Sequence, residues 1–246
     1  MGYREVLYST YVSANKNYLY QSINACERDK NIRNTLWSLR DWLPEKETAP
    51  RVLDLGCGAG HMLAVFQRVG YTDFVGVDNS AEQVEIARRL FSNVVQADVF
   101  EYLKRDNIGE FDLIMAFDVI EHLTRDEAIQ FLQLIHQHLK PDGSLILQMP
   151  NGDTPFVGSV FWLDLTHETL FTVVSLRHLL EACGFTNCQF QERGPVPRSI
   201  FGISRVILWR IVRLAIKTIH YIETGTPSTN IYTRVFVCRA TKRREK

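Results

Sequence analysis

Cysteine is scarce in this 246-residue chain, and its placement excludes two kinds of small stabilised domain. The five cysteines are odd in number, and no two of them form a C-x-x-C pair. A disulfide framework and a zinc ribbon both require paired cysteines at characteristic spacings, so we expect neither. A reducing, cytoplasmic compartment fits this usage best. The five residues are Cys26, Cys57, Cys183, Cys188 and Cys238.

An excess of one charge and a long apolar run are also missing. The 28 basic side chains balance the 28 acidic ones, so no overall field would attract nucleic acid, and we expect no nucleic-acid partner. Without a run of about eighteen apolar residues, the sequence predicts no membrane-spanning helix. No repeat period indicates a solenoid. The 46% of hydrophobic residues is nevertheless enough to build the core of a folded unit.

From Arg51 onward, short apolar runs alternate with segments of helical periodicity. This alternation is typical of β-α units that build a parallel sheet, with helices on both of its faces. The carboxyl ends of the parallel strands share one edge, where a ligand is expected to bind. The expected strands are Val52–Leu55, Phe74–Val77, Val94–Ala97, Phe111–Phe117 and Ser144–Gln148, followed by Phe185–Phe190 and Asn230–Cys238.

Several helix boundaries are encoded by short polar signals. Ser80 with Gln83 and Thr124 with Glu127 match the reciprocal capping box at a helix start. A further helix is expected over Ser175–Cys183, and the segment Pro141–Gly143 predicts a turn into the fifth strand. Residues 1–50 are expected to form a helical flank or lid. Residues 51–246 would then form the main domain, with 195–229 as a helical insertion.

A glycine-rich loop follows the first strand, in the order Asp54-Leu55-Gly56-Cys57-Gly58-Ala59-Gly60. Its G-x-G-x-G spacing differs from the G-x-G-x-x-G of dinucleotide-binding folds, which seats a pyrophosphate. Asp78 and Asp98 end the next two strands, where carboxylates are able to accept hydrogen bonds from ribose or adenine. Together these residues predict a site for an adenosine that carries a charged tail.

This arrangement resembles the class I S-adenosylmethionine-dependent methyltransferases over residues 50–192. The resemblance implies a Rossmann-like α/β fold with a mostly parallel, doubly wound sheet, and S-adenosylmethionine as the cofactor. It also implies cofactor contacts of three kinds. These are the methionine part at Asp54, Gly56, Gly58 and Phe117; the ribose at Asp78 and Asn79; and the adenine at Asp98 and Val99.

A group of acids and histidines follows the fourth strand. If Asp118–His122 forms one helical turn, Asp118, Glu121 and His122 share a face. A second histidine, His167, lies in a later loop that is expected to cover the same edge. These four residues are candidate ligands of Mg²⁺, Mn²⁺, Fe²⁺ or Zn²⁺. The pattern resembles that of metal-dependent methyltransferases acting on vicinal hydroxyls, with Asp118 in place of the usual glutamate. In the alternative, metal-free interpretation, His122 or His167 accepts a proton from the acceptor hydroxyl. A third interpretation gives these residues only a structural role, as a cap and core contact.

The segment 199–222 is amphipathic and basic. On a helical projection, its five basic side chains fall within an arc of about 140°, and apolar residues fill the remainder. Such a helix is suited to a membrane surface that carries anionic headgroups, and packing on the core or against a second copy is the alternative. The five are Arg205, Arg210, Arg213, Lys217 and His220.

These features lead to a functional hypothesis. The loop around His167, the helix ending at Cys183 and the basic helix resemble bacterial methyltransferases of cell-surface polysaccharide synthesis. We therefore expect an O-methyltransferase acting on a sugar hydroxyl of a glycan or lipid-linked saccharide, in the cytoplasm or at the inner face of the membrane. The alternatives are a quinone-type or other lipid-phenol O-methyltransferase, an RNA 2′-O-methyltransferase and a non-catalytic protein that binds the cofactor.

Overall fold

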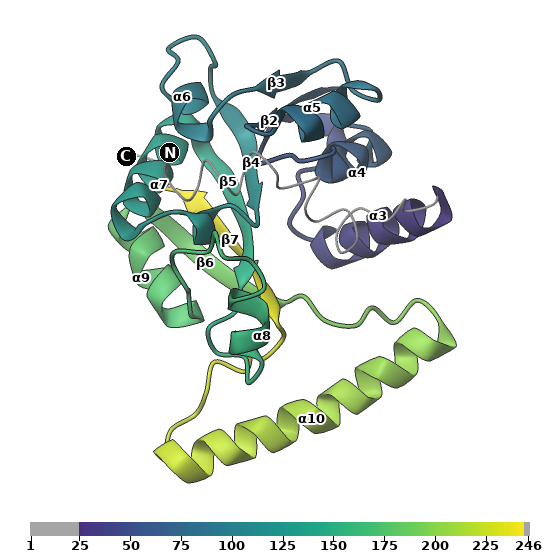
Figure 1. The fold of residues 1–246 in the computed structure, drawn as a ribbon, viewed down its shortest axis with the longest axis vertical. Coiled ribbons are helices and arrows are strands. Elements are labelled where there is room, and N and C mark those ends of the chain that lie inside the picture. Colours follow the sequence, from purple (N-terminus) through teal and green to yellow (C-terminus); the bar gives the residue numbers. More distant parts are fainter. Residues whose placement is uncertain (1–24, 244–246) are drawn as a thin grey trace.

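The computed structural model describes residues 25–243, which form an α/β fold around a seven-stranded sheet (Figure 1). The strand order is β3-β2-β1-β4-β5-β7-β6. The first five strands are parallel, and β7 runs antiparallel to both of its neighbours. The strands are β1 (Arg51–Leu55), β2 (Asp73–Asp78), β3 (Val94–Gln96), β4 (Phe111–Phe117), β5 (Leu139–Pro150), β6 (Phe185–Glu192) and β7 (Val235–Lys242).

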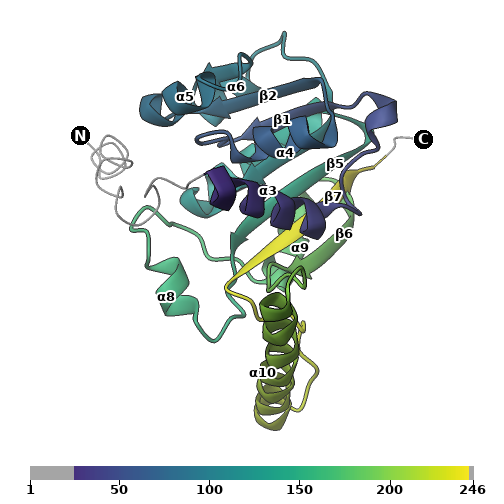
Figure 2. The ribbon, with the colours of Figure 1, turned by 90° about the vertical axis from the view of Figure 1, so that its right-hand side faces the viewer.

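Helices cover both faces of the sheet, as Figures 1 and 2 show. Alternating residues of the central strands point to opposite faces, so Leu53 and Ile114 join one apolar cluster while Val52 and Leu113 join the other. One face carries α3 (Ala25–Leu39), α4 (His61–Val69) and α5 (Ala81–Arg88). The other carries α6 (Val99–Leu103), α7 (Arg125–His138) and α9 (Val173–Ala182). This arrangement confirms the expected doubly wound, mostly parallel sheet.

The helix starts largely follow the capping signals. The Thr124 hydroxyl accepts a hydrogen bond from the Glu127 amide, and the Glu127 carboxylate accepts one from the Thr124 amide, so this capping box is confirmed. Ser80 caps α5 by accepting from the Gln83 amide. At the far end of α9, Gly184 has a φ of +91°, in the positive range that glycine commonly adopts where a helix ends.

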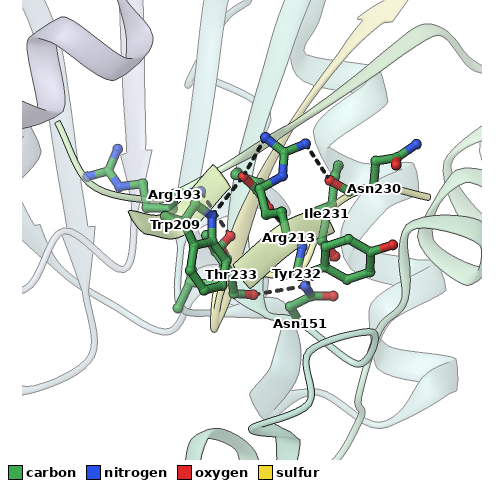
Figure 3. Close-up of polar contacts among 10 residues, drawn as sticks. Asn151, Arg193, Trp209, Arg213, Asn230, Ile231, Tyr232 and Thr233 are labelled. Carbon is green, nitrogen blue, oxygen red and sulfur yellow. Dashed lines mark hydrogen bonds and ion pairs between the residues drawn. The ribbon is translucent and has the colours of Figure 1, made fainter. Parts of the chain in front are cut away.

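Two expected strand starts were wrong. Pro141–Gly143 forms an irregularity inside β5 instead of a turn before it, because Leu139 already pairs with Phe111 and the register shifts before Ser144. Asp142 at this point has a φ of +64°. The last strand begins at Val235 and not at Asn230. The preceding residues are held outside the sheet because the buried Asn151 side chain donates hydrogen bonds to the carbonyls of Ile231 and Thr233 (Figure 3).

Three shorter elements and one long helix complete the described chain. Short 3-10 turns occupy η1 (Lys46–Thr48) and η2 (Ile120–His122), and α8 (Val157–Phe161) follows β5. The expected basic helix is α10 (Ile200–Thr224), which lies at one end of the molecule beyond the sheet (Figures 1 and 2). Within the described residues, no helix combines the length and the apolar composition that crossing a membrane requires.

Candidate active site at the carboxyl edge of the sheet

The glycine loop between β1 and α4 brings its backbone unusually close to neighbouring elements. Gly56, Gly58 and Gly60 have φ values of +73°, +52° and +85°, which side chains with a β-carbon rarely adopt. A β-carbon at Gly56 would lie 2.4 Å from Cγ2 of Val119. The amides of Gly56 and Cys57 both donate to the Val77 carbonyl, so the loop is fixed to the end of β2.

Asp78 is bonded to this loop. One of its carboxylate oxygens accepts from the Gly58 amide at 2.8 Å, and the other accepts from the Ser80 amide at 2.8 Å. Each carboxylate oxygen is able to accept a second hydrogen bond, so these contacts leave capacity for ribose hydroxyls. Burial raises the pKa of Asp78, and the two amide bonds oppose that rise. The neighbouring Asn79 is exposed.

Asp54 lies at the end of β1 and is almost fully buried, with 2% of its surface exposed. Within the described part of the chain, its Oδ2 atom has no hydrogen-bond partner. Burial raises the pKa of this carboxyl well above its usual range, and the charge of Asp78 adds to the effect. A buried acceptor without a donor is costly, so Asp54 is suited to a ligand that supplies a donor or a positive charge.

Asp98 and Phe117 complete the sequence-derived set at this edge. Asp98 caps α6, because its Oδ1 accepts from the amides of Phe100 and Glu101, and Val99 is the first residue of that helix. The Oδ2 atom takes no part in these capping bonds. The half-buried Phe117 ends β4, and the Arg193 guanidinium lies over its ring at 5.6 Å from the centroid. Strand order therefore places the ends of β1 to β4 along one edge, as predicted.

Three of the four candidate metal ligands come together. One ligand atom from each of Glu121, His122 and His167 lies within 4.8 Å of the others. The two imidazole rings have centroids 4.8 Å apart. Asp118 is not part of this group, because its φ of +54° takes it out of the expected helical turn, which is confined to η2. The Asp118 carboxylate instead accepts from the Gln148 side-chain amide at 3.0 Å.

The loop carrying His167 is fastened to η2 by backbone contacts. The amides of Glu168 and Thr169 both donate to the Glu121 carbonyl, at 2.7 and 3.0 Å. Asp164 shapes the loop from within, since its Oδ1 accepts from both the amide and the hydroxyl of Thr166. The Asp-x-Thr spacing of Asp164 and Thr166 is a local sequence signal for such a side-chain-supported turn.

Hydrogen bonds fix the orientation of both imidazoles. Nδ1 of His167 lies 2.7 Å from the Phe161 carbonyl oxygen, which is only able to accept. In neutral His167, Nδ1 therefore carries the proton and Nε2 retains its lone pair. Nδ1 of His122 lies 2.8 Å from the Thr166 hydroxyl, whose hydrogen is donated to Asp164, so the same tautomer follows for His122. Each Nε2 is thus able to accept a proton or to bind a metal ion.

Glu121 is the acidic member of the cluster. Its side chain is 1% exposed, and among the described residues neither carboxylate oxygen has a hydrogen-bond partner. Burial raises the pKa of Glu121 well above its usual range, and the carboxylates of Asp118 and Asp164 raise it further. An orphaned buried carboxylate beside two imidazole nitrogens is a donor set that fits a divalent transition metal. The chemistry of these residues therefore agrees with the metal interpretation, as it does with that of a histidine base.

Arg193 is a candidate site residue that the sequence did not reveal. Its Nη2 donates to the Thr35 hydroxyl of α3 at 2.9 Å, and that hydroxyl is 3.2 Å from Nε2 of His61. Its Nη1 atom is buried and has no hydrogen-bond partner among the described residues. Arg193 also lines a cavity of about 160 Å³ together with Asn34, Ser38 and Arg205. A single arginine after a strand carries no local signal, so only the fold reveals this position.

With this geometry described, comparison with known proteins identifies the family. Residues 28–189, more than half of the chain, match a family model described as a methyltransferase domain. The chain belongs to this family. The methyltransferase domain also has the fold of an S-adenosylmethionine-dependent methyltransferase from Archaeoglobus fulgidus, with a TM-score of 0.67 and 21% identity over 94% of this chain and 99% of that one. The family match and this shared fold both support S-adenosylmethionine as the cofactor.

Two curated relatives match shorter segments of the methyltransferase domain, and a further solved structure shares its fold. A mitochondrial ubiquinone biosynthesis O-methyltransferase from Rattus norvegicus is 33% identical over 41% of this chain and 31% of its own length. A trans-aconitate 2-methyltransferase from Azoarcus sp. (strain BH72) is 38% identical over 44% of this chain and 43% of its own length. The chain thus spans less than half the length of these two curated relatives. A phosphoethanolamine N-methyltransferase 2 from Haemonchus contortus, solved with S-adenosyl-L-methionine, has a TM-score of 0.59 at 16% identity over 95% of this chain and 60% of that one.

The comparisons support only part of the sequence-based hypothesis. The class I methyltransferase fold and the S-adenosylmethionine cofactor are confirmed. The relatives named for ubiquinone biosynthesis give no support to the expected link with polysaccharide synthesis. The individual roles of the site residues remain predictions.

Proposed function

We propose that this domain transfers the methyl group of S-adenosylmethionine to a hydroxyl oxygen of a phenolic acceptor that carries an apolar tail. The observation that carries the proposal is the cluster of Glu121, His122 and His167, in which two imidazole rings lie beside a buried carboxylate. A hydroxyl acceptor needs such a group because its oxygen becomes a good nucleophile only as its proton leaves. The relatives named as ubiquinone biosynthesis O-methyltransferases support the phenolic class over a sugar.

In the proposed complex, the cofactor lies along the ends of β1 to β4. Asp78 accepts hydrogen bonds from the ribose hydroxyls, and Asp98 with Val99 contacts the adenine. Asp54, Gly56 and Phe117 contact the methionine part, whose ammonium group would supply the missing partner of Asp54. We propose that Arg193 belongs to this set, because its Nη1 has no hydrogen-bond partner in the part of the chain that the structure describes, and its position over Phe117 suits the methionine carboxylate.

The proposed methyl transfer is a single displacement. The acceptor oxygen attacks the methyl carbon as the bond from that carbon to sulfur breaks, so the sulfonium becomes the neutral thioether of S-adenosylhomocysteine. The acceptor proton moves to Nε2 of His167, whose Nδ1 donates to the Phe161 carbonyl and holds the ring in place. Positioning of the two reactants in line supplies much of the rate acceleration.

A metal ion is the second candidate for activating the acceptor, and the orphaned carboxylate of Glu121 favours it. Glu121, His122 and His167 would hold the ion. Bound there, a divalent ion acts as a Lewis acid that lowers the pKa of a coordinated hydroxyl. Removing metal by chelation separates the two interpretations, since a histidine base retains activity in chelator whereas a metal-dependent site loses it and recovers on addition of the ion.

The surroundings of His167 support an apolar acceptor. Trp162, Leu163 and Leu165 precede it in the loop, and their side chains are 66%, 69% and 70% exposed. Phe156, at the start of α8, is a further exposed aromatic residue at 49%. Large apolar side chains gathered beside a candidate catalytic group are suited to contact an apolar substrate. A free saccharide would gain little from these contacts.

Turnover with defined acceptors tests the proposal. The purified domain is mixed with S-adenosylmethionine and either a polyprenylated catechol or a free disaccharide, and formation of S-adenosylhomocysteine is measured. We expect product only with the catechol. Product with the disaccharide alone would favour the glycan hypothesis, and cofactor binding without turnover on hydroxyl acceptors of either kind would contradict O-methyl transfer.

A further inference from the structure

Helix α10 turns its apolar face to solvent and its polar face to the domain, which is the opposite of an ordinary surface helix. Such helices normally direct their apolar face to the protein core. In α10, Ile and Leu side chains that share one arc of the helix face solvent, with exposed fractions from 53% to 89%. Gly202 is the only buried residue of this helix. The exposed arc is formed by Ile200, Ile207, Leu208, Ile211, Leu214 and Ile222.

Polar contacts hold the opposite side of α10 against the domain (Figure 3). The Trp209 indole donates to the Glu192 carboxylate at 3.2 Å, and the Arg213 guanidinium lies 3.4 Å from the same carboxylate. Arg213 also donates to the Asn230 carbonyl at 3.0 Å. At the helix start, a β-carbon on Gly202 would lie 2.4 Å from the Val196 carbonyl oxygen, so the backbones there are in close contact. The attachment therefore fixes which side of α10 faces outward.

Basic side chains border the outward apolar face. At 100° per residue, Arg210 and Lys217 lie along one border of this face and Arg205 along the other. All three are exposed. Glu223 is the only acidic residue of the helix. Exposed apolar surface flanked by cations is complementary to a bilayer that contains anionic lipids, where the apolar side chains enter the acyl region and the cations contact the headgroups.

The charge of α10 disfavours a second copy of the chain as the occupant. Two helices paired through their apolar faces would bring the borders with Arg210 and Lys217 into proximity, with a single acidic residue on each helix to offset them. Like charges at such a border destabilise a pairing. Anionic lipids have no such conflict. The helix also does not qualify as a membrane span, so it would lie along the surface.

We propose that α10 docks this domain on the surface of a bilayer that contains anionic lipids, through the apolar face centred on Ile211. This docking does not depend on the identity of the methyl acceptor. Helix α8, whose Phe161 carbonyl contacts His167, lies at the same end of the molecule as α10 in both ribbon views (Figures 1 and 2). Docking through α10 brings the loop that carries His167 toward the membrane.

Vesicle flotation tests the docking. The full chain is mixed with vesicles of phosphatidylcholine, with and without phosphatidylglycerol, at low and high salt. We expect flotation with the anionic vesicles and weaker binding at high salt. Ile211→Gln combined with Leu214→Gln should reduce the partition coefficient of the chain onto anionic vesicles more than about tenfold, because two apolar side chains no longer enter the acyl region. Arg210→Gln and Lys217→Gln should each reduce it about fivefold at low salt.

Matched controls make the result specific. Leu90→Gln and Val174→Gln change side chains that are 53% and 51% exposed on other parts of the domain, and they should leave flotation unchanged. Thermal unfolding and binding of S-adenosylhomocysteine show whether each variant is folded. If the wild type floats with neither kind of vesicle, the proposal is wrong. If light scattering instead shows a dimer that Ile211→Gln and Leu214→Gln dissociate, the face is an interface between copies.

Discussion

Two buried carboxylates at the same edge of the sheet have oxygens without a hydrogen-bond partner among the described residues, namely Oδ2 of Asp54 and both oxygens of Glu121. Burial raises the pKa of each carboxyl group well above its ordinary range. Such groups lower the stability of the ligand-free protein, because the charged carboxylate has lost its hydration without gaining a hydrogen-bond donor. Their presence is explained by ligands that supply the missing charge or donor.

Asp54→Asn tests this cost directly. The folded-state pKa of Asp54 is raised, so the unfolded chain loses its proton first, and stability falls as the pH rises from the unfolded value of about 3.9 through the folded one. An asparagine does not ionise. At neutral pH we expect the free energy of unfolding of the Asp54→Asn variant to exceed that of the wild type by about 1–3 kcal/mol. We also expect this variant to bind the cofactor more weakly. Chemical denaturation and calorimetry measure the two effects.

Asp112→Asn is the matched control for that substitution. Asp112 is the second residue of β4 and lies toward the edge of the sheet opposite to the site. It accepts from the Arg51 amide and the Lys140 ammonium, both at 2.8 Å. Loss of these charged contacts should lower stability and leave cofactor binding intact. A stabilised Asp112→Asn variant, or an Asp54→Asn variant that is less stable than the wild type, would contradict the assignment.

His167→Ala separates acceptor activation from cofactor binding. The His167 ring is oriented through Nδ1 by the Phe161 carbonyl, so Nε2 is the atom available for chemistry. We expect turnover to fall by about 10²-fold or more, with cofactor affinity unchanged, as measured by product formation and calorimetry. His178→Ala, at an exposed position on α9, should retain full activity. Full activity of His167→Ala would exclude both interpretations of the cluster.

At the scale of the elements, local sequence signals determined where most helices and strands begin. The capping box at Thr124 and the boundaries of β4 follow directly from residue order. The errors arose where a distant contact overrides a local signal. Pairing of Leu139 with Phe111 extends β5 through a proline-glycine segment, and the buried Asn151 keeps Ile231 and Thr233 out of the last strand.

One carboxylate makes several of the contacts that attach α10 to the domain. Glu192 accepts from the Tyr232 amide at 2.9 Å and from the Trp209 indole, and it pairs with Arg213. Glu192→Ala should therefore lower the free energy of unfolding by about 1–3 kcal/mol and speed amide exchange in α10 and around Tyr232. Hydrogen exchange read by mass spectrometry measures this. Glu181→Ala, at an exposed position on α9, should change neither quantity, and equal exchange in both variants would contradict the role of Glu192.

At the scale of the whole molecule, the cofactor is expected to connect residues from several strands. A ligand that binds only the folded state at about one hundred times its dissociation constant adds about 2.7 kcal/mol of stability. For a domain of this size, that corresponds to a rise in melting temperature of about 5–11 °C. S-adenosylmethionine or S-adenosylhomocysteine should produce this rise in a thermal shift measurement.

Asp78→Ala should reduce that rise, because ribose hydroxyls lose an acceptor and binding weakens by about 1–3 kcal/mol. Asp73→Ala is the matched control, since Asp73 begins the strand that Asp78 ends and pairs with Arg51 at the opposite edge of the sheet. It should leave the ligand-induced rise unchanged. An equal rise in all three proteins would place the cofactor away from Asp78.

The sequence by itself determined the sheet, most element boundaries and the candidate cofactor residues at the strand ends, because periodicity, glycine spacing and strand-terminal acids are local patterns. It also located Glu121, His122 and His167. The tertiary structure decided that Asp118 bonds to Gln148 outside that cluster, that Arg193 lies over Phe117, and that α10 turns its apolar face outward. Each of these depends on contacts between residues far apart in the chain, and such contacts leave no trace in local spacing.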